Sequence, residues 1–338
     1  MDTFPLHKLP DRAFSWVLRK LEIYDQLAYS LCSRNAKSAI KSLNLKAFEI
    51  EFTVTHKIEM RISFENYIFI FFYIDHDANF PDNQLISCGD VRVSVELPDG
   101  IPIRWEWSFQ NSEIKEWLRH FCDVLHHPKI DDLMFNDADI DDAYIIPVQK
   151  AIEGLQIGCL SVCEELTPEF TKKALESFSS YEKLFVDLIL FENHDLFKMD
   201  KYLIQNLKSV CIDDAEKIVI NQVLFTNSER IQLNLTMFTE KDFNKFLKLW
   251  IRGSNPRLKY FQTRGEPEDG NDSFDENVIL KGIKYQRVLL DSEESYKEHV
   301  FGNFYNETKL AGGSRIWRTD GTAAVMVVTG NMFQLIAE

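Results

Sequence analysis

The stretch RIQLNL at residues 230–235, followed by DFNKFLKLW at residues 242–250, decides the fold of this chain. In the first segment apolar and polar residues alternate, which is typical of a β-strand with one buried face. In the second segment Phe243, Phe246, Leu247 and Trp250 recur at helical spacing. This spacing predicts an amphipathic helix over residues 239–251 with those four side chains buried. The basic unit is therefore a strand followed by a helix.

The strand pattern, a short apolar pair of the form L-x-L, recurs along the chain between helical segments. The pairs are Leu133/Phe135, Leu160/Val162, Leu188/Leu190, Val210/Ile212, Leu233/Leu235 and Leu258/Tyr260, spaced by 27, 28, 22, 23 and 25 residues. Such spacing is typical of leucine-rich repeats, in which each strand and helix buries its apolar face against the next unit. The asparagine expected after the pair occurs only at Asn193. We therefore predict a leucine-rich-repeat-like domain over residues 111–265.

The residues on either side of this domain follow other patterns. Residues 46–110 show period-two alternation of β-branched and aromatic residues, which predicts a small antiparallel β-sheet with a tight turn at PDG, residues 98–100, and a loop over residues 75–90. After a loop over residues 264–277, residues 278–338 form a tail unit. Its TDG sequence at residues 319–321 predicts a β-hairpin.

Residues 1–45 predict three short helices. In the first helix Ala13, Val17, Leu18 and Leu21 form an apolar stripe. Helices this short are marginal alone, so we expect part of their apolar surface to contact a partner or the next domain. The predicted fold class is α+β: a three-helix module, a small antiparallel sheet, the repeat-like domain and a β-containing tail.

The charge balance limits the possible partners. Against 38 Lys and Arg the chain has 53 Asp and Glu, a net charge of −15. The first 45 residues carry seven basic and four acidic side chains, so the remainder carries −18. Nucleic acids and anionic membranes bind through clustered cations, so neither is expected as a partner. Six scattered cysteines and the lack of a long apolar run predict an intracellular protein, cytoplasmic or nuclear, that is neither secreted nor embedded in a membrane.

No motif predicts chemistry. The acidic run at residues 136–142 has Asp142 where a calcium loop needs glycine. Cys159 and Cys163 lack zinc-finger spacing, and His126 and His127 have no nucleophile or carboxylate partner in a known motif. We therefore expect no catalytic residue, no metal and no cofactor. An enzyme whose motif is not recognised stays open as an alternative function.

Two segments resemble known families. FPLHKLPD at residues 4–11, VL at 17–18 with Leu21, and SLCS at 30–33 are similar to the F-box, the helical module that docks adaptors on the Skp subunit of cullin-RING ubiquitin ligases. RIQLNL, DFNKFLKLW and GSNPRL at residues 253–258 resemble the type-2 F-box-associated domain, a family expanded in nematodes. Gln26 stands where F-boxes usually have leucine, and the tryptophan that many F-boxes carry near Ala36 is missing.

The resemblance implies a non-enzymatic substrate adaptor of a Skp-cullin-F-box ubiquitin ligase. The residues that would occupy or support the Skp-binding surface are Leu9, Pro10, Val17, Leu18, Leu21, Leu27 and Leu31. A cullin would be recruited through Skp, and a protein substrate of unknown identity would bind the C-terminal domain.

Alternation along the repeat strands places the candidate substrate-binding residues on the face opposite the apolar pairs: Asp187, Ile189, Ser209, Cys211, Gln232 and Asn234. The charge of −18 favours a substrate with a basic patch. Another layer of structure could instead cover this face. The alternative function is a Skp-bound scaffold or interaction protein without ligase activity.

Overall fold

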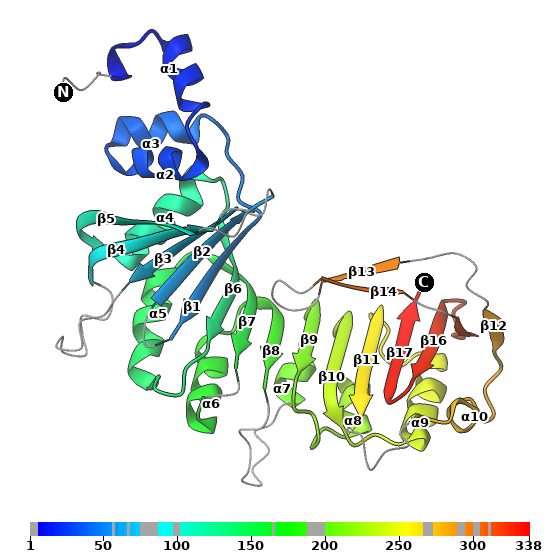
Figure 1. Ribbon diagram of the computed structural model, residues 1–338. Coiled ribbons are helices and arrows are strands. Elements are labelled where there is room, and N and C mark those ends of the chain that lie inside the picture. The colour runs from blue at the N-terminus through cyan, green and yellow to red at the C-terminus, as the bar shows by residue number, and fades with distance from the viewer. Residues whose placement is uncertain are drawn as a thin grey trace. The chain divides into compact units, whose positions relative to one another are not determined.

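The computed structural model describes residues 6–55, 58–65, 68–74, 87–96, 102–163, 166–187, 200–265, 273–288, 295–299, 305–309 and 312–338. Figure 1 shows its helices and strands. The elements of the first half are η1 (Leu6–Lys8), α1 (Asp11–Leu18), α2 (Ile23–Leu31), α3 (Arg34–Lys41), β1 (Glu49–Val54), β2 (Ile58–Phe64), β3 (Ile68–Ile74), β4 (Ser87–Glu96), β5 (Pro102–Glu113), α4 (Ile114–Val124), β6 (Lys129–Phe135), η2 (Asp142–Tyr144), α5 (Ile145–Ile152) and β7 (Gln156–Val162). Those of the second half are α6 (Pro168–Ser177), β8 (Tyr181–Val186), α7 (Asp200–Leu203), β9 (Ser209–Ile212), α8 (Ile220–Phe225), β10 (Arg230–Thr236), α9 (Glu240–Ile251), β11 (Tyr260–Gly265), α10 (Glu276–Ile279), β12 (Gln286–Val288), β13 (Ser295–His299), β14 (Tyr305–Lys309), β15 (Gly313–Trp317), β16 (Ala323–Thr329) and β17 (Met332–Ala337).

The chain divides into two compact units. Unit 1 comprises Met1–Cys159 and Glu169–Ser180, and unit 2 comprises Leu160–Pro168 and Tyr181–Glu338. Each unit combines helices with a sheet, so the predicted α+β class is confirmed. The predicted boundaries near residues 45, 110 and 265 do not coincide with the ends of these units, and the four-domain division stays a prediction.

The sheet of unit 1 has the strand order β6-β1-β2-β3-β4-β5. Strands β1 to β5 pair antiparallel, whereas β1 and β6 run parallel with Phe52 opposite Leu133. One face of the sheet is covered by α4, where the Phe72 ring lies 6.1 Å from the Trp117 ring and 4.7 Å from the Phe121 ring. The predicted antiparallel strands are therefore confirmed, while the turn at 98–100 and most of the loop at 75–90 lie outside the described residues.

The sheet of unit 2 has the strand order β12-β15-β16-β17-β11-β10-β9-β8. Strands β8 to β11 run parallel, and β17, β16, β15 and β12 continue the sheet antiparallel. The inward side chains of the parallel strands are Leu184 and Val186, Val210 and Ile212, Ile231 and Leu233, and Phe261 and Thr263, all at most 1% exposed. The parallel strands alternate with α7, α8 and α9, as the strand and helix unit predicts.

Two of the predicted apolar pairs need correction, and a third lies outside the described residues. Leu188 and Leu190 lie outside the described residues, and the strand of that unit ends at Val186. Leu235 is 38% exposed and adopts a left-handed backbone (φ 51°) where the register of β10 shifts. The buried apolar pair of β10 is therefore Ile231 and Leu233. Leu258 precedes β11, and Tyr260 lies on the other face from Phe261. An apolar dipeptide pattern does not fix where a strand begins, because tertiary pairing decides the register.

Helix α9 forms as predicted and is the centre of the core of unit 2. Its N-cap Thr239 exchanges hydrogen bonds with Asp242 in a capping box, which stabilises the first turn. Phe243, Phe246, Leu247 and Trp250 are all 0% exposed, which confirms the predicted buried face. The Phe243 ring stacks on Phe333 of β17 at 4.4 Å, so the helix packs against C-terminal strands as well as parallel ones.

Strands β12, β15, β16 and β17 of the C-terminal tail are part of this sheet, whereas β13 and β14 pair with each other in a separate two-stranded sheet. The predicted hairpin forms between β15 and β16 with Gly321 at φ 94°, and β17 then pairs with β11. Arg318, in the hairpin, donates a hydrogen bond to the Asn255 carbonyl at 3.3 Å, and its guanidinium lies 5.1 Å from the Trp250 ring. The hairpin thereby holds the turn at residues 253–255, which follows α9, in place.

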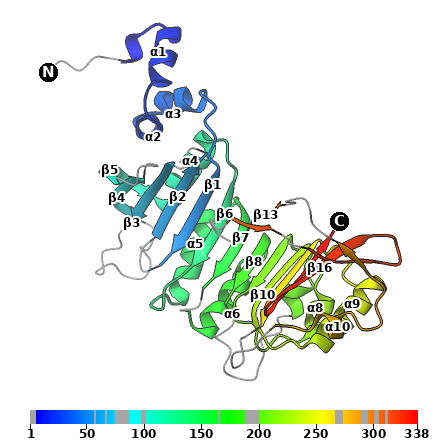
Figure 2. The ribbon, with the colours of Figure 1, turned by 45° about the vertical axis from the view of Figure 1, so that its right-hand side comes forward.

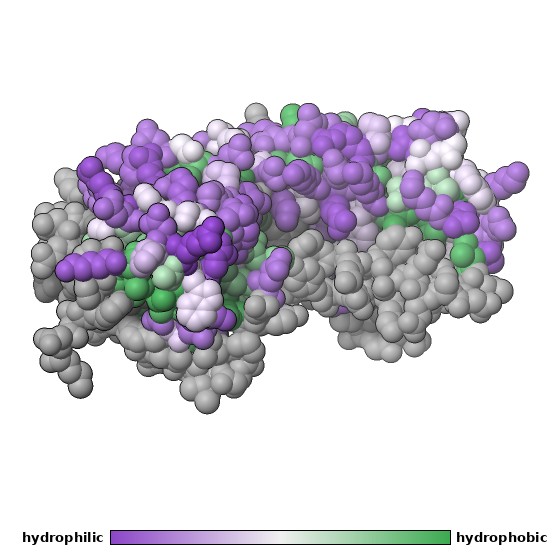
Figure 3. Space-filling view, turned by 90° about the horizontal axis from the view of Figure 1, so that it is seen from above, coloured by the Kyte–Doolittle hydropathy of each residue, from purple (hydrophilic) through white to green (hydrophobic). Residues whose placement is uncertain are grey.

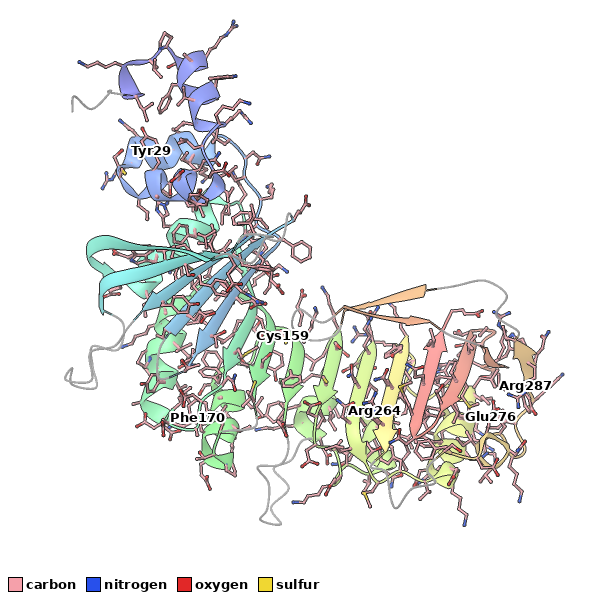
Figure 4. All side chains as sticks on the ribbon, viewed as in Figure 1. Tyr29, Cys159, Phe170, Arg264, Glu276 and Arg287 are labelled. Carbon is pink, nitrogen blue, oxygen red and sulfur yellow. The ribbon has the colours of Figure 1, made fainter. Side chains whose placement is uncertain are left out.

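An ion pair ties the last helix, α10, to the edge of the sheet. Glu276 of α10 accepts a hydrogen bond from Arg287 at 2.5 Å and another from the Ser314 hydroxyl at 2.9 Å. Figure 4 labels Glu276 and Arg287 at this edge. Because Ser314 lies in β15, the pair joins α10, β12 and β15.

Candidate docking site

The first three helices form from local signals. Pro10, at φ −57°, precedes α1 and Asp11 places a carboxylate in its first turn, which suits the helix dipole. The Ser33 hydroxyl caps α3 by accepting a hydrogen bond from the Ala36 amide at 3.1 Å. The Phe14 ring of α1 meets the Tyr29 ring of α2 edge-on at 6.4 Å. The helices therefore form a small core of their own.

The structure separates the seven predicted Skp-binding residues into two groups. Leu18 and Leu27 are 1% and 0% exposed in the chain alone, so they support the surface from below and cannot face a partner. Pro10 is exposed, and four residues are half-buried: Leu9, Val17, Leu21 and Leu31. The sequence pattern predicts that Leu18 belongs to a stripe buried only by the partner, but its side chain is already 1% exposed in the chain alone.

Trp16 is the docking candidate that the sequence pattern missed. Its side chain is 63% exposed on α1, with the Lys20 ammonium 5.7 Å from the ring. It lies outside the stripe of Val17 and Leu21 that helical spacing selected. A large aromatic residue on the polar side of an amphipathic helix is the signal that could have found it, because exposed aromatics mark interaction sites.

The structure explains how Gln26 can stand where F-boxes usually have leucine. Its amide nitrogen donates hydrogen bonds to the carbonyls of Leu18 and Leu21, both at 2.9 Å, and the side chain is buried. Carbonyls at the C-terminal end of a helix lack partners within the helix. Gln26 therefore caps α1 from α2, and a polar residue replaces the usual leucine without leaving its donor unsatisfied.

The three helices are fixed to the rest of unit 1 through α4, which lies between α3 and the strands in both views (Figure 1 and Figure 2). The Ser30 hydroxyl and His120 Nε2 are 2.8 Å apart. Burial and the nearby Lys37 lower the pKa of His120 to about 4, so the imidazole is neutral at pH 7. We conclude that this contact is a neutral hydrogen bond.

Asp123 completes the junction from the next turn of α4. Its carboxylate pairs with Lys41 Nζ at 2.5 Å and with Lys37 Nζ at 2.9 Å, and hydrogen bonds from Lys41 and Lys37 lower its pKa. His126 Nε2 lies 3.0 Å from the Lys41 carbonyl. Helix α4 thus contacts the sheet through Trp117 and Phe121 and the first three helices through polar groups.

The predicted substrate face in unit 2 is only partly accessible. Ser209 and Cys211 of β9 pair in register with Arg230 and Gln232 of β10, so the structure does bring these side chains together. Asp187, Ser209 and Cys211 are 6%, 8% and 2% exposed, whereas Gln232 and Asn234 are half-buried. The Asn234 amide donates to Asp213 at 2.5 Å. Ile189 lies outside the described residues.

The described residues do not assemble a metal site or a membrane span. No group of three or more His, Cys, Asp or Glu residues suited to a metal occurs among them. In the acidic run, Asp137 and Asp141 accept hydrogen bonds from the amides of Asp139 and Ala143, as turn-capping residues do. No helix in the described part of the chain is both long and apolar enough to cross a bilayer.

Comparison with known proteins agrees with these observations. The F-box domain model matches residues 6–48, which include α1 to α3, and the F-box associated model matches residues 198–263, which include α7 to β11. The chain therefore combines an F-box with an F-box-associated domain. F-boxes in general bind the Skp subunit in ubiquitin ligases as parts of substrate adaptors, and both families are interaction domains rather than catalytic ones.

The chain is also similar along most of its length to one curated protein. It is 23% identical over 286 residues to the F-box associated domain-containing protein sdz-33 of Caenorhabditis elegans, covering 83% of this chain and 85% of that protein. No solved structure matches. The similarity extends well beyond the two matched domains, so the relative shares most of the chain, including much of the region between them.

Proposed function

We propose that this chain is the substrate-recognition adaptor of a Skp-cullin-F-box ubiquitin ligase. The observation that carries the proposal is the half-exposed apolar surface of α1 and α2 within the matched F-box, headed by Trp16 at 63% exposure. In this arrangement the F-box docks on the Skp subunit, a cullin joins through Skp, and the C-terminal domain holds a protein substrate. Ubiquitin transfer is performed by other subunits, and this chain forms and breaks no bond.

The other parts of the chain fit this role. The parallel strands and helices of unit 2 would act as a leucine-rich-repeat-like scaffold, within a division into residues 1–45, 46–110, 111–265 and 278–338. The substrate face would include Asp187, Ile189, Ser209, Cys211, Gln232 and Asn234. Because Gln232 and Asn234 keep the most accessible area of those whose burial is described, they are the residues through which this face would act first. An adaptor of this kind would operate in the cytoplasm or the nucleus.

Co-purification of the tagged full chain from cells tests the proposal. An adaptor should recover Skp and a cullin together, and Trp16→Asp should remove both, because it places a carboxylate in the docking surface. The control is Trp317→Asp on β15, since Trp317 is 39% exposed but lies in unit 2. If the wild-type chain recovers neither subunit, or if Trp317→Asp removes them equally, the proposal is wrong.

The alternative function is a Skp-bound scaffold or interaction protein without ligase activity. It predicts recovery of Skp without a cullin from the same purification. Proximity labelling by the intact chain and by the Trp16→Asp variant separates substrates from other neighbours. Proteins labelled by both forms that accumulate only when Trp16 is replaced would be ligase substrates.

A further inference from the structure

Helix α1 gathers positive charge around the exposed Trp16. Arg12, Trp16 and Lys20 follow one another at intervals of four residues, and Arg19 comes three residues after Trp16. Residues three and four apart lie on the same side of a helix. All four side chains are exposed, and Trp16 is 63% exposed. We call these four residues the cationic-aromatic face.

The three cations of this face make no ion pair among the residues that the structure describes. By contrast, Lys37 and Lys41 of α3 are both paired with Asp123. The Lys20 ammonium lies 5.7 Å from the centre of the Trp16 ring, which is a cation–π contact. A ring does not neutralise a charge, so all three cations remain available to carboxylates of a partner.

The first three helices offer few carboxylates that could balance these cations. Residues 1–45 carry seven basic and four acidic side chains, whereas the rest of the chain carries −18. Two of the four carboxylates act on α2, because burial together with Asp25 and Glu22 raises the pKa of Tyr24. Asp11 lies in the first turn of α1, and Asp2 lies outside the described residues. The module is therefore positive within a chain that is otherwise strongly negative.

Apolar residues connect the cationic-aromatic face to the apolar stripe of the F-box. Ala13, which is exposed, lies three residues before Trp16 and four before the half-buried Val17. Hydrophilic residues predominate around the first three helices (Figure 3), so this apolar area is limited in extent. An aromatic anchor with apolar neighbours and a charged rim is the usual composition of a protein interface.

We propose that the cationic-aromatic face receives an acidic segment of the Skp subunit, with carboxylates around the site that takes up the Trp16 ring. Arg12 and Arg19 would each bind a carboxylate through the forked guanidinium group, and Lys20 would add charge. Unlike charges speed association, whereas burial of the indole slows dissociation. The inference rests on the adaptor proposal and deepens it, because it names the chemistry of the partner's surface.

A nucleic acid or an anionic membrane is the other class of partner that cations and a tryptophan could bind. Two observations favour a protein. The face adjoins an apolar stripe within the F-box match, and the chain beyond residue 45 carries −18, which repels a phosphate-bearing surface.

Surface plasmon resonance with the purified full chain and the Skp subunit of the same organism tests the proposal, because it measures association and dissociation separately. Arg12→Gln with Arg19→Gln and Lys20→Gln should lower the association rate constant about tenfold and change dissociation by less than about threefold. Trp16→Ala should mainly speed dissociation. NaCl raised from about 0.05 M to about 0.5 M should slow the wild type to the rate of the triple variant.

A matched control removes the same charge elsewhere. Lys150 of α5, Lys241 of α9 and Lys284 after α10 are exposed, lie outside the F-box match and make no ion pair among the described residues. Lys150→Gln with Lys241→Gln and Lys284→Gln should associate with Skp like the wild type. Melting curves establish that each variant is folded, and the NaCl series on the wild type decides the question if the triple variant does not fold.

Two results would overturn the proposal: equal association rates for the triple variant and its control, or an association rate of the wild type that NaCl does not change. It is also wrong if the triple variant associates normally with Skp but no longer binds vesicles of phosphatidylserine and phosphatidylcholine that the wild type binds. If the wild type does not bind Skp, the adaptor proposal fails together with this inference. If Skp binds with kinetics that do not depend on charge, only this inference fails.

Discussion

Helices α1 and α9 are both amphipathic and each carries a tryptophan, yet the two side chains have opposite surroundings. Trp16 of α1 is 63% exposed, and its ring contacts Lys20 from the same helix. Trp250 of α9 is 0% exposed, and Arg318, 68 residues further along the chain, lies over its ring. The difference arises from what covers each helix rather than from the helix itself.

The coverage differs because of sequence distance. Helix α9 packs on strands from both its own region and the C-terminus, with Phe246 against Phe261 and Phe243 against Phe333. Helix α1 contacts α2 through the Phe14 and Tyr29 rings and through the bond from Gln26 to the Leu18 carbonyl, and its Leu18 side chain is buried while Trp16 is exposed. A helix covered on one side retains a surface for a partner, and a helix in a sheet-backed core does not.

Trp250→Ala should have the largest effect. It removes a fully buried ring and the partner of the Arg318 guanidinium, so we expect a loss of about 3 to 5 kcal/mol in the free energy of unfolding. Urea titration followed by circular dichroism measures it. Trp16→Ala is the matched control and should change stability by less than about 0.5 kcal/mol. If Trp250→Ala and Trp16→Ala lose the same free energy of unfolding, the two tryptophans do not differ in burial as the structure indicates.

Trp16→Ala should instead weaken Skp binding. An exposed tryptophan at the centre of an interface typically contributes about 2 kcal/mol, which corresponds to roughly a thirtyfold rise in Kd. Surface plasmon resonance with immobilised Skp measures it, and Trp317→Ala on β15 serves as the exposed-tryptophan control. Unchanged affinity for Trp16→Ala would mean that the partner contacts another side of the helices.

Gln26→Leu should restore the usual F-box residue at a cost. The carbonyls of Leu18 and Leu21 lose a buried donor, so we expect a loss of about 1 to 2 kcal/mol despite the gain of an apolar side chain. Differential scanning calorimetry measures the change. Gln205→Leu is the control, because the Gln205 amide nitrogen donates a 3.3 Å bond to the carbonyl of Lys201 in the short helix α7 just before it. A stabilised Gln26→Leu variant would contradict the capping role.

Glu49→Gln should have a smaller, pH-dependent effect. Burial and the neighbouring Glu51 and Asp131, opposed by Arg61, raise the pKa of Glu49 to about 7, and Asp131 is itself paired with His127 and Lys129. The folded state then holds the proton more tightly than the unfolded state, so stability falls as pH rises from about 4.5 towards 7.

The substitution should therefore stabilise unit 1 by about 1 kcal/mol above pH 7, after allowance for solvent screening, and by little below pH 5. Melting midpoints from pH 5 to pH 8 test this, with exposed Glu65→Gln as the control. If Glu49→Gln raises the melting midpoint equally at pH 5 and at pH 8, the neighbours of Glu49 do not raise its pKa.

Much of the local structure was predictable from particular residues. Period-two alternation found β1 to β3, and Phe243, Phe246, Leu247 and Trp250 defined the buried face of α9, because both patterns depend on neighbours within a few residues. The FPLHKLPD and GSNPRL motifs identified the two matched domains. Register was harder: Leu235 looked like a core residue, but a shift in the ladder turns it to solvent.

The candidate sites depended more on tertiary contacts. Helical spacing selected Leu18 and passed over Trp16, although Leu18 is 1% exposed and Trp16 is 63% exposed in the folded chain. Strand alternation placed Ser209 and Cys211 on the correct common face, yet both are buried.

The sequence by itself determined the elements, the α+β class and the two domain resemblances, because turn residues, caps and hydrophobic periods act over short distances. Only the tertiary structure decided which faces remain accessible, since burial depends on segments far apart in the chain. Arg318 meets Trp250, Asp123 joins Lys37 and Lys41, and Gln26 caps α1 through contacts that no local pattern encodes. Accessibility, and with it the choice of docking surface, is a property of the assembled chain.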